Sequence, residues 1–300
     1  MLLLLLVLAN FLPFGDGDVV NPISADGSSE AIYLQQPFKY FGRAYNQIYV
    51  NNNGHLTFTL PLSAYVPYLN AGIDIIAPLW TDLFNVDGGT ISYREDTSSA
   101  VLAQVTQAVN QYFPNVPFTA TSAFVATWDS VPYYSGEGVV TFQVVLVSND
   151  DRSFILNNYG DIAQTGQVWL AGYDTVDSVN SFTIPAASAP ELSYSSNINV
   201  NGRWSFRVDG SANCKSGVLG CVCLDGQRPN LEFFGKRFHT CCAFILYIHL
   251  KSFHTLTVNF QSLHSYVLLS HSLKTVNPLM GKILRHVVRL IWTVQSVKNN

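Results

Sequence analysis

The first 232 residues of this 300-residue chain offer few groups that could do chemistry. Their single histidine, His55, begins a predicted strand beside an Asn-Gly turn, a position that predicts a surface residue rather than a general base. The sequence contains no Gly-x-Ser-x-Gly elbow for a nucleophilic serine, no His-Glu-x-x-His zinc motif and no phosphate-binding Walker loop. We therefore predict that the chain is not an enzyme.

Pairs of acidic residues suggest a second chemistry, because glycosidases act with two carboxylates about 5 to 10 Å apart. Asp16 with Asp18, and Asp150 with Asp151, are such pairs. A chain with 20 acidic residues contains pairs in any case, and Asp150-Asp151 is more simply explained as a hairpin turn between two strands. A secreted carbohydrate-binding or carbohydrate-active protein is therefore the alternative function.

Aspartates in predicted loops could also bind calcium, which takes oxygen ligands and is held weakly by many extracellular modules. The candidates are Asp16, Asp18, Asp26, Asp82 and Asp87. Their spacing does not match a calcium loop such as the EF-hand, so ordinary turn aspartates are the favoured interpretation. We expect no cofactor, with a weak structural calcium site as the alternative.

Tyrosines in proline-containing loops are the candidates for a protein interface, namely Tyr65, Tyr68, Tyr133 and Tyr134. An exposed tyrosine combines apolar area with a polar tip, and this combination is common at interfaces. The competing interpretation, which we favour, is that these rings cap the ends of the fold.

All five cysteines follow residue 213, so the part of the chain before them must fold without a disulfide. Cys214, Cys221 and Cys223 have the spacing of an opening cysteine-rich extracellular module, and we predict that they form disulfides. A zinc site is the weaker alternative, because two-residue gaps between ligands are missing and the next histidine is His239.

The elements that must position these residues are predicted to be mainly β-strands. Charged residues make up only 12% of the chain, and short apolar runs are separated by Gly, Asn, Asp and Pro. This pattern is typical of an all-β sandwich or barrel, of which we predict an antiparallel β-sandwich. The clearest hairpin joins residues 48–50 to residues 55–60 through an Asn-Asn-Asn-Gly turn, with one face formed by Leu56, Phe58 and Leu60.

Further strands are predicted at residues 75–78, 90–94, 124–128, 139–148, 153–159, 168–173 and 203–209. Residues 139–147 are almost entirely apolar, which predicts a central strand that is covered on both faces. The last strand is expected to complete the sheet. Its inward residues would be Trp204, Phe206 and Val208, and its outward residues Arg203, Ser205 and Arg207.

One α-helix is predicted, with Thr97 or Ser98 as its N-cap and Pro114 as its stop signal. Its apolar residues recur at helical spacing, so this face should pack on the sheet. They are Val101, Val105, Ala108, Val109 and Tyr112.

The two ends of the chain differ from the middle. Residues 1–10 contain a run of five leucines that predicts a short secretory signal. The run is too short to cross a bilayer, which takes about 20 apolar residues.

Residues 1–232 contain all 20 acidic residues and eight basic residues, a net charge of −12. This charge argues against nucleic-acid binding, which needs a basic surface. We predict no transmembrane helix.

Residues 233–300 contain eight basic residues, no acidic residue and six of the seven histidines. A membrane-associated segment and a small domain are two interpretations, but the apolar run at 243–250 is too short to span and turn signals are poor. The interpretation that we favour is a poorly structured tail that is disordered or not genuine coding sequence.

A series of short motifs, in order, resembles the NIDO (nidogen-type) extracellular domain. They include Leu-Pro-Phe-Gly at 12–15, Pro-Phe-Lys-Tyr-Phe-Gly at 37–42, Ile-Tyr-Val-Asn-Asn-Asn-Gly at 48–54, Ile-Ala-Pro-Leu-Trp-Thr-Asp at 76–82 and Gly-Arg-Trp-Ser-Phe-Arg-Val-Asp at 202–209. The resemblance covers residues 11–209. Residues 210–232 would then be the start of a cysteine-rich module.

The resemblance implies a secreted extracellular-matrix or cell-matrix adhesion module that binds matrix or cell-surface proteins without catalysis. Alpha-tectorin-like or sushi-nidogen-EGF-like members of the family are the most similar. The sushi, EGF or von Willebrand repeats that usually follow the domain are not found, which leaves open that the chain is a fragment of a larger mosaic protein.

Overall fold

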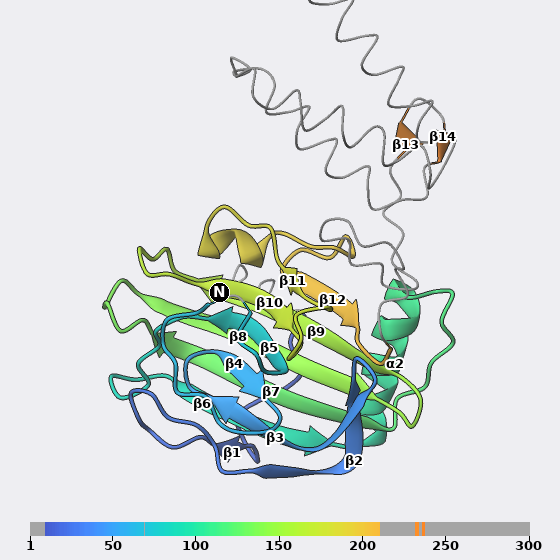
Figure 1. Cartoon of the computed structure of the whole chain (residues 1–300), viewed down its shortest axis with the longest axis horizontal. Helices are drawn as coiled ribbons and strands as arrows, with labels where there is room; N and C mark the ends of the chain where they lie inside the picture. The colour runs from blue at the N-terminus through green and yellow to red at the C-terminus, as the bar shows by residue number, and fades with distance from the viewer. Residues whose placement is uncertain (1–9, 69, 211–231, 234–235, 238–300) are drawn as a thin grey trace, which may run out of the picture. The chain divides into compact units, whose positions relative to one another are not determined.

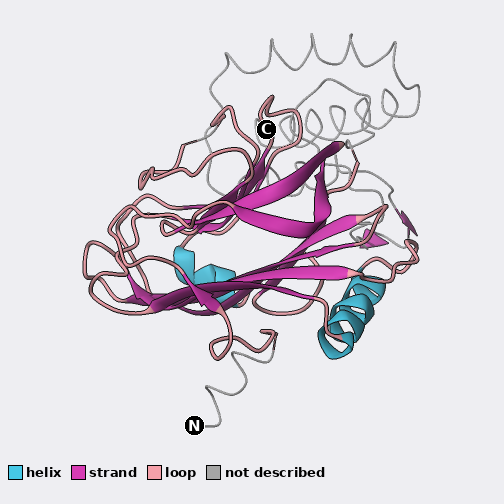
Figure 2. Ribbon diagram, turned by 90° about the horizontal axis from the view of Figure 1, so that it is seen from below, coloured by secondary structure: helices cyan, strands magenta, loops and turns pink. Residues whose placement is uncertain are grey.

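The computed structural model describes residues 10–68, 70–210, 232–233 and 236–237. Residues 10–210 form two antiparallel six-stranded sheets that pack face to face, with one α-helix on the outer side (Figures 1 and 2). The predicted β-sandwich with a packed helix is therefore confirmed. Two short strands, β13 (Glu232–Phe233) and β14 (Lys236–Arg237), pair with each other.

The first sheet has the order β1-β6-β7-β8-β9-β12. Its strands are β1 (Val19–Val20), β6 (Thr90–Asp96), β7 (Ser122–Pro132), β8 (Val139–Ser148), β9 (Ser153–Ile162) and β12 (Arg203–Arg207). The strand β8 is buried along nine of its ten residues, so the prediction of a central strand covered on both faces is confirmed.

The second sheet has the order β11-β10-β5-β4-β3-β2. Its strands are β11 (Phe182–Thr183), β10 (Leu170–Asp174), β5 (Ile75–Trp80), β4 (His55–Thr57), β3 (Arg43–Asn51) and β2 (Ile32–Tyr40). The sequence did not predict β2 as a strand, because Gln35, Gln36 and Pro37 interrupt its apolar pattern. Its edge position tolerates the proline, which lacks a donor for the ladder.

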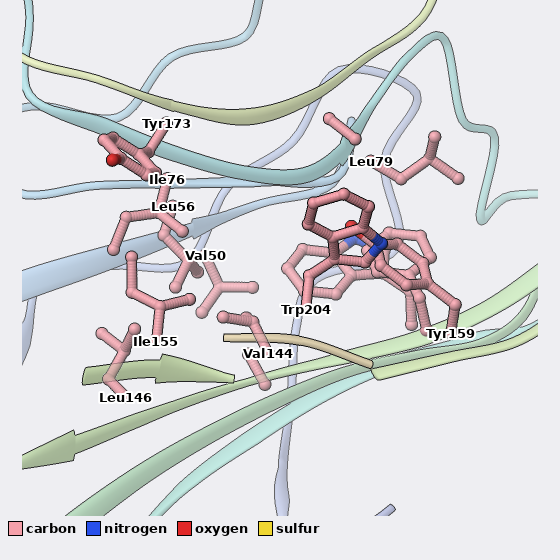
Figure 3. Close-up of a cluster of buried hydrophobic side chains, with 14 of the residues drawn as sticks. Val50, Leu56, Ile76, Leu79, Val144, Leu146, Ile155, Tyr159, Tyr173 and Trp204 are labelled. Atoms are coloured by element: carbon pink, nitrogen blue, oxygen red, sulfur yellow. The ribbon is translucent and has the colours of Figure 1, made fainter. Parts of the chain in front are cut away.

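The main core lies between the sheets. Val144, Leu146 and Ile155 of the first sheet face Val50, Leu56 and Ile76 of the second, as Figure 3 shows. Burying each such side chain stabilises the fold by about 1.5–3 kcal/mol. This apolar layer explains how residues 10–210, which contain no cysteine, fold without disulfides.

The helix α2 (Ser99–Tyr112) covers the outer face of the first sheet. Ser98 is its N-cap, and Val101, Val105 and Val109 are buried against the sheet, as predicted. A short 3-10 helix, η1 (Ala189–Ser193), precedes β12.

Two expectations about side-chain direction were wrong. Arg203 and Ser205 are buried, because segments beyond the strand cover the outer face of β12. The Arg203 guanidinium donates to Asn158 Oδ1 at 2.7 Å and to the Tyr112 hydroxyl of α2 at 2.9 Å. Leu60 is exposed rather than inward, since β4 ends at Thr57.

Several sequence predictions lie outside the described residues. These are the signal-like segment up to residue 9, the disulfides of Cys214, Cys221 and Cys223, and the tail from residue 238. Within the described part of the chain, no helix has the length and apolarity that a membrane crossing requires.

Candidate protein-contact surface

The turn between β3 and β4 is built from three consecutive buried asparagines and a glycine. Asn51 accepts a hydrogen bond from the backbone N–H of Leu62 at 2.8 Å and donates to His55 O at 3.1 Å. Gly54 has φ of 84°, and a Cβ there would lie 1.9 Å from Leu79 O. The turn therefore requires glycine both for its conformation and for its contact with β5.

The other two asparagines hold neighbouring loops. Asn52 donates to Ser24 O at 2.9 Å, within residues 21–31 that lead into β2. Asn53 donates to Asp26 Oδ1 at 2.9 Å and accepts from the N–H of Leu83, which follows β5. Together with Asn51, this asparagine turn fixes three loops that are distant in sequence.

His55 is fully buried beside this turn, so its prediction as a surface residue was wrong. Its ring lies 4.7 Å from that of Trp80, and its Nε2 lies 3.0 Å from Leu62 O. Nδ1 lies 3.4 Å from a second carbonyl, Asn53 O, and since a carbonyl can only accept, the shorter contact favours the neutral ring with its proton on Nε2. Burial lowers the pKa of His55 to about 4, which keeps the ring uncharged at neutral pH.

The β4–β5 loop, described at residues 58–68 and 70–74, carries the most prominent apolar side chains of this region. Loops longer than about 12–15 residues without regular structure are uncommon and often functional. Four apolar side chains of this loop are about half exposed or more: Leu60 (69%), Tyr65 (51%), Val66 (51%) and Tyr68 (47%). The structure thus places two of the predicted interface tyrosines, Tyr65 and Tyr68, on one exposed loop.

A hollow of about 190 Å³ lies beside this loop, over β5 and β10. Tyr68 and Trp80 line it together with Ile75, Ala77 and Leu170. The remaining lining residues are Asn70, Ala71, Tyr173, Asp174, Ser181 and Thr183. Pockets for small-molecule ligands usually measure about 300–1,000 Å³, so this hollow has room for one long side chain rather than a large ligand.

The other two predicted interface residues lie apart from this loop and differ from each other. Tyr134 is 63% exposed, and its ring packs edge-on against Phe84 at 5.3 Å. Tyr133 is buried and donates to Ala163 O at 3.0 Å. Tyr133 is therefore a core residue, which agrees with the favoured interpretation that these rings cap the fold and removes it from the candidates for an exposed interface.

The aspartates proposed as calcium ligands have separate roles. Asp18 forms an ion pair with Arg94 at 3.0 Å, and Asp26 accepts from Asn53. Burial, with a smaller contribution from Asp26, raises the pKa of Asp82. Among the described residues, no three His, Cys, Asp or Glu side chains come together as metal ligands would.

The Asp150-Asp151 pair belongs to the turn between β8 and β9, as predicted. Asn149 Oδ1 accepts from the backbone N–H groups of Asp151 at 3.0 Å and Arg152 at 2.8 Å. This geometry is an Asx-type turn, which explains the acidic pair without catalysis.

Charge is strongly biased over the sandwich, since residues 10–210 contain 18 acidic and six basic residues. Arg43, Arg94 and Arg207 are in ion pairs with aspartates, and Arg203 is buried. The surface is therefore acidic, and a basic partner would complement it.

Comparison with known proteins identifies the domain. The nidogen-like domain profile matches residues 46–210, which is more than half of the chain. The chain belongs to the nidogen-like domain family. Alpha-tectorin from mouse is 37% identical over 66% of this chain, and Drosophila melanogaster nidogen is 31% identical over 61%. Human nidogen-1 is 26% identical over 74% of the chain.

The chain spans only 10% of mouse alpha-tectorin, 15% of the Drosophila nidogen and 20% of human nidogen-1. No solved structure matches this chain. Alpha-tectorin and nidogen are extracellular matrix proteins, so the expected extracellular location is confirmed. The start of this nidogen-like domain at residue 11 stays a prediction, which the pairing of β2 with β3 supports.

Proposed function

We propose that this nidogen-like domain is a non-catalytic contact module that binds other matrix or cell-surface proteins through the β4–β5 loop. The observation that carries the proposal is the group of exposed apolar side chains on that loop, with Tyr65 and Tyr68 at its centre. Tyrosine is enriched at protein interfaces and at their energetic centres.

The way the loop is held supports the same function. Leu62 N–H binds Asn51, and the Trp80 indole N–H donates to Ala64 O at 2.8 Å. The base of the loop is thus fixed while its tyrosines remain exposed. A contact surface that is already ordered loses less conformational entropy on binding than a mobile one.

The chemistry of the buried groups supports contact rather than catalysis. His55 has both ring nitrogens near backbone carbonyls and is closed off from solvent. A general base must reach a substrate proton, and this ring is enclosed by Trp80 and the β4–β5 loop.

A binding assay with the full chain tests the proposal. Secreted protein is applied to immobilised decellularised matrix, and the Tyr65→Ser/Tyr68→Ser double variant is compared with Tyr33→Ser/Tyr194→Ser. Tyr33 (76%) and Tyr194 (61%) are as exposed but lie outside the loop. We expect at least about a tenfold loss of affinity for the first variant alone, since interface tyrosines often contribute more than about 1 kcal/mol. Equal binding by all three proteins would overturn the proposal.

A further inference from the structure

The hollow beside Tyr68 combines an apolar floor with an acidic edge. Ile75, Ala77 and Leu170 supply aliphatic surface, and Asp174 is the single carboxylate among the lining residues. The volume of about 190 Å³ suits one extended side chain. An occupant that matches both features has an aliphatic stem and a cationic end.

Asp174 differs from the two acidic residues closest to it in the fold. Arg43 forms ion pairs with Asp74 at 3.0 Å and with Asp177 at 3.5 Å. Asp174 accepts from the Thr175 N–H at 2.8 Å and the Ser178 hydroxyl at 3.0 Å, and the backbone of Asn70 and Ala71 also binds its carboxylate. All of these partners are neutral, and among the described residues the ion pairs of Arg43, Arg94 and Arg207 do not include Asp174. Burial raises the pKa of this carboxyl group, and the hydrogen bonds that it accepts offset only part of that rise.

We propose that this hollow receives an arginine or lysine side chain from a basic extracellular protein partner, with the charged end at Asp174. The inference rests on the contact function proposed above and names the chemistry of its partner. The methylene stem lies along Ala77 and Ile75, of which Ile75 pairs with Asp174 across the strands, because long cationic side chains bury their stems on apolar surface. The Tyr68 ring stands beside the path of the cation, where a cation–π contact adds to the attraction.

The charge of the whole domain favours the same occupant. With 18 acidic and six basic residues between positions 10 and 210, the sandwich attracts a basic protein and repels a second copy of itself. A neutral sugar fits the hollow less well, because it brings no charge to pair with Asp174 and because Trp80 is 1% exposed and packs against His55 at 4.7 Å and Tyr68 at 5.3 Å. Tyr68, 47% exposed, is then the one half-open aromatic ring among the lining residues.

The indole N–H of Trp80 provides a reporter for binding. The full chain is labelled with ¹⁵N-tryptophan, its five indole signals are recorded, and Trp80→Phe assigns the one from the hollow. The probes are acetyl-Gly-Arg-Gly-amide and the same peptide with citrulline, an uncharged isostere of arginine. We expect the arginine peptide to shift the Trp80 signal with at least about tenfold higher affinity than the citrulline peptide.

Two variants separate the charge from the shape of the hollow. Asp174→Asn keeps the acceptor oxygen for Thr175 and should weaken arginine binding about tenfold. Tyr68→Ala should weaken binding of both peptides. Asp161→Asn is the matched control, because Asp161 is exposed and lies outside the hollow, and it should bind like the wild type.

Equal shifts with both peptides, or no effect of Asp174→Asn, would overturn the inference. It would also be overturned if the Trp80 signal shifted only with methyl N-acetylglucosaminide, which would indicate a sugar, or only at a higher concentration of the chain, which would indicate a second copy. The matrix assay distinguishes this failure from failure of the proposed function. If Tyr65→Ser/Tyr68→Ser loses matrix binding while Asp174→Asn does not, the contact function stands and the cationic occupant is wrong. If the arginine peptide binds as expected while no variant affects matrix binding, the hollow does bind a cationic side chain and the proposed contact function is wrong.

Discussion

The side-chain Oδ1 of Asn51 lies 2.8 Å from the backbone nitrogen of Leu62, and this hydrogen bond joins the asparagine turn to the β4–β5 loop. Both groups are withdrawn from solvent to a large extent, with Asn51 fully buried. Asn51, in the Asn-Asn-Asn-Gly motif, therefore holds the loop that exposes Tyr65 and Tyr68, although Asn51 does not contact a partner itself.

Replacing Asn51 by alanine should destabilise the fold and loosen the loop. The change removes the side-chain bonds of Asn51 to Leu62, His55, Ser28 and Thr57, at a cost of about 2–4 kcal/mol. Urea unfolding of the full chain measures the free energy, with the exposed Asn115→Ala as control. A variant that is as stable as the wild type would contradict the central role of the turn.

Replacing Gly54 by alanine should be more damaging than the same change at another glycine with positive φ. At Gly54 the new Cβ would lie 1.9 Å from Leu79 O, whereas Gly15, with φ of 105°, has nothing within 4 Å. Gly15→Ala therefore has only backbone strain, about 1–2 kcal/mol, while Gly54→Ala also displaces β4 from β5. Thermal unfolding should show a much lower Tm for Gly54→Ala, and similar Tm values for both variants would contradict the close contact.

The sequence predicted most strands because apolar alternation follows the pleat, but alternation does not reveal what covers the second face. Arg203 and Ser205 were expected to be exposed, and α2 and its neighbours bury them. His55 was also expected at the surface, and the β4–β5 loop encloses it. Tyr112 lies 91 residues before Arg203, so a local period around β12 carries no information about it. The loop that encloses His55 follows β4 directly, but it has no regular period from which its path could be predicted.

The same limit applies to the candidate surface. The loop position of Tyr65 and Tyr68 made them candidates, whereas Trp80 on β5 and Asp174 on β10 complete the hollow only because the sheet brings these strands together. Tyr133 and Tyr134 belong to one motif, yet Tyr133 pairs with Leu83 while Tyr134 lies in the turn that the Gly136 N–H to Tyr133 O bond closes. One of them therefore enters the core and the other faces solvent.

The stability of the domain should fall on acidification in a way that depends on His55. The pKa of His55 is about 4 in the folded protein and 6.5 ordinarily, so between these values the unfolded chain binds more protons. Stability therefore decreases as the pH falls from about 7 to 4, by about 3 kcal/mol, and this contribution is constant above pH 7.

The variant His55→Gln isolates this effect, because glutamine can still donate to Leu62 O and does not titrate. Urea unfolding between pH 4 and pH 7 should give a steeper pH dependence for the wild type than for the variant. Carboxyl groups titrate in both proteins, so their contribution cancels in the difference. Parallel curves would mean that His55 is not held neutral in the folded state.

Replacing Trp80 by phenylalanine should weaken matrix binding without unfolding the domain. The phenyl ring keeps its contacts with His55 and Tyr68, but the hydrogen bond to Ala64 O is lost, so the β4–β5 loop loses one of its fixed points. Trp204→Phe is the matched control, because its indole N–H donates to the Ser195 hydroxyl at 3.2 Å, outside this loop. Each change should reduce stability by a similar amount, about 1–2 kcal/mol. Only Trp80→Phe should lower the affinity for immobilised matrix, and an equal loss in both variants would show that global stability, rather than the order of this loop, governs binding.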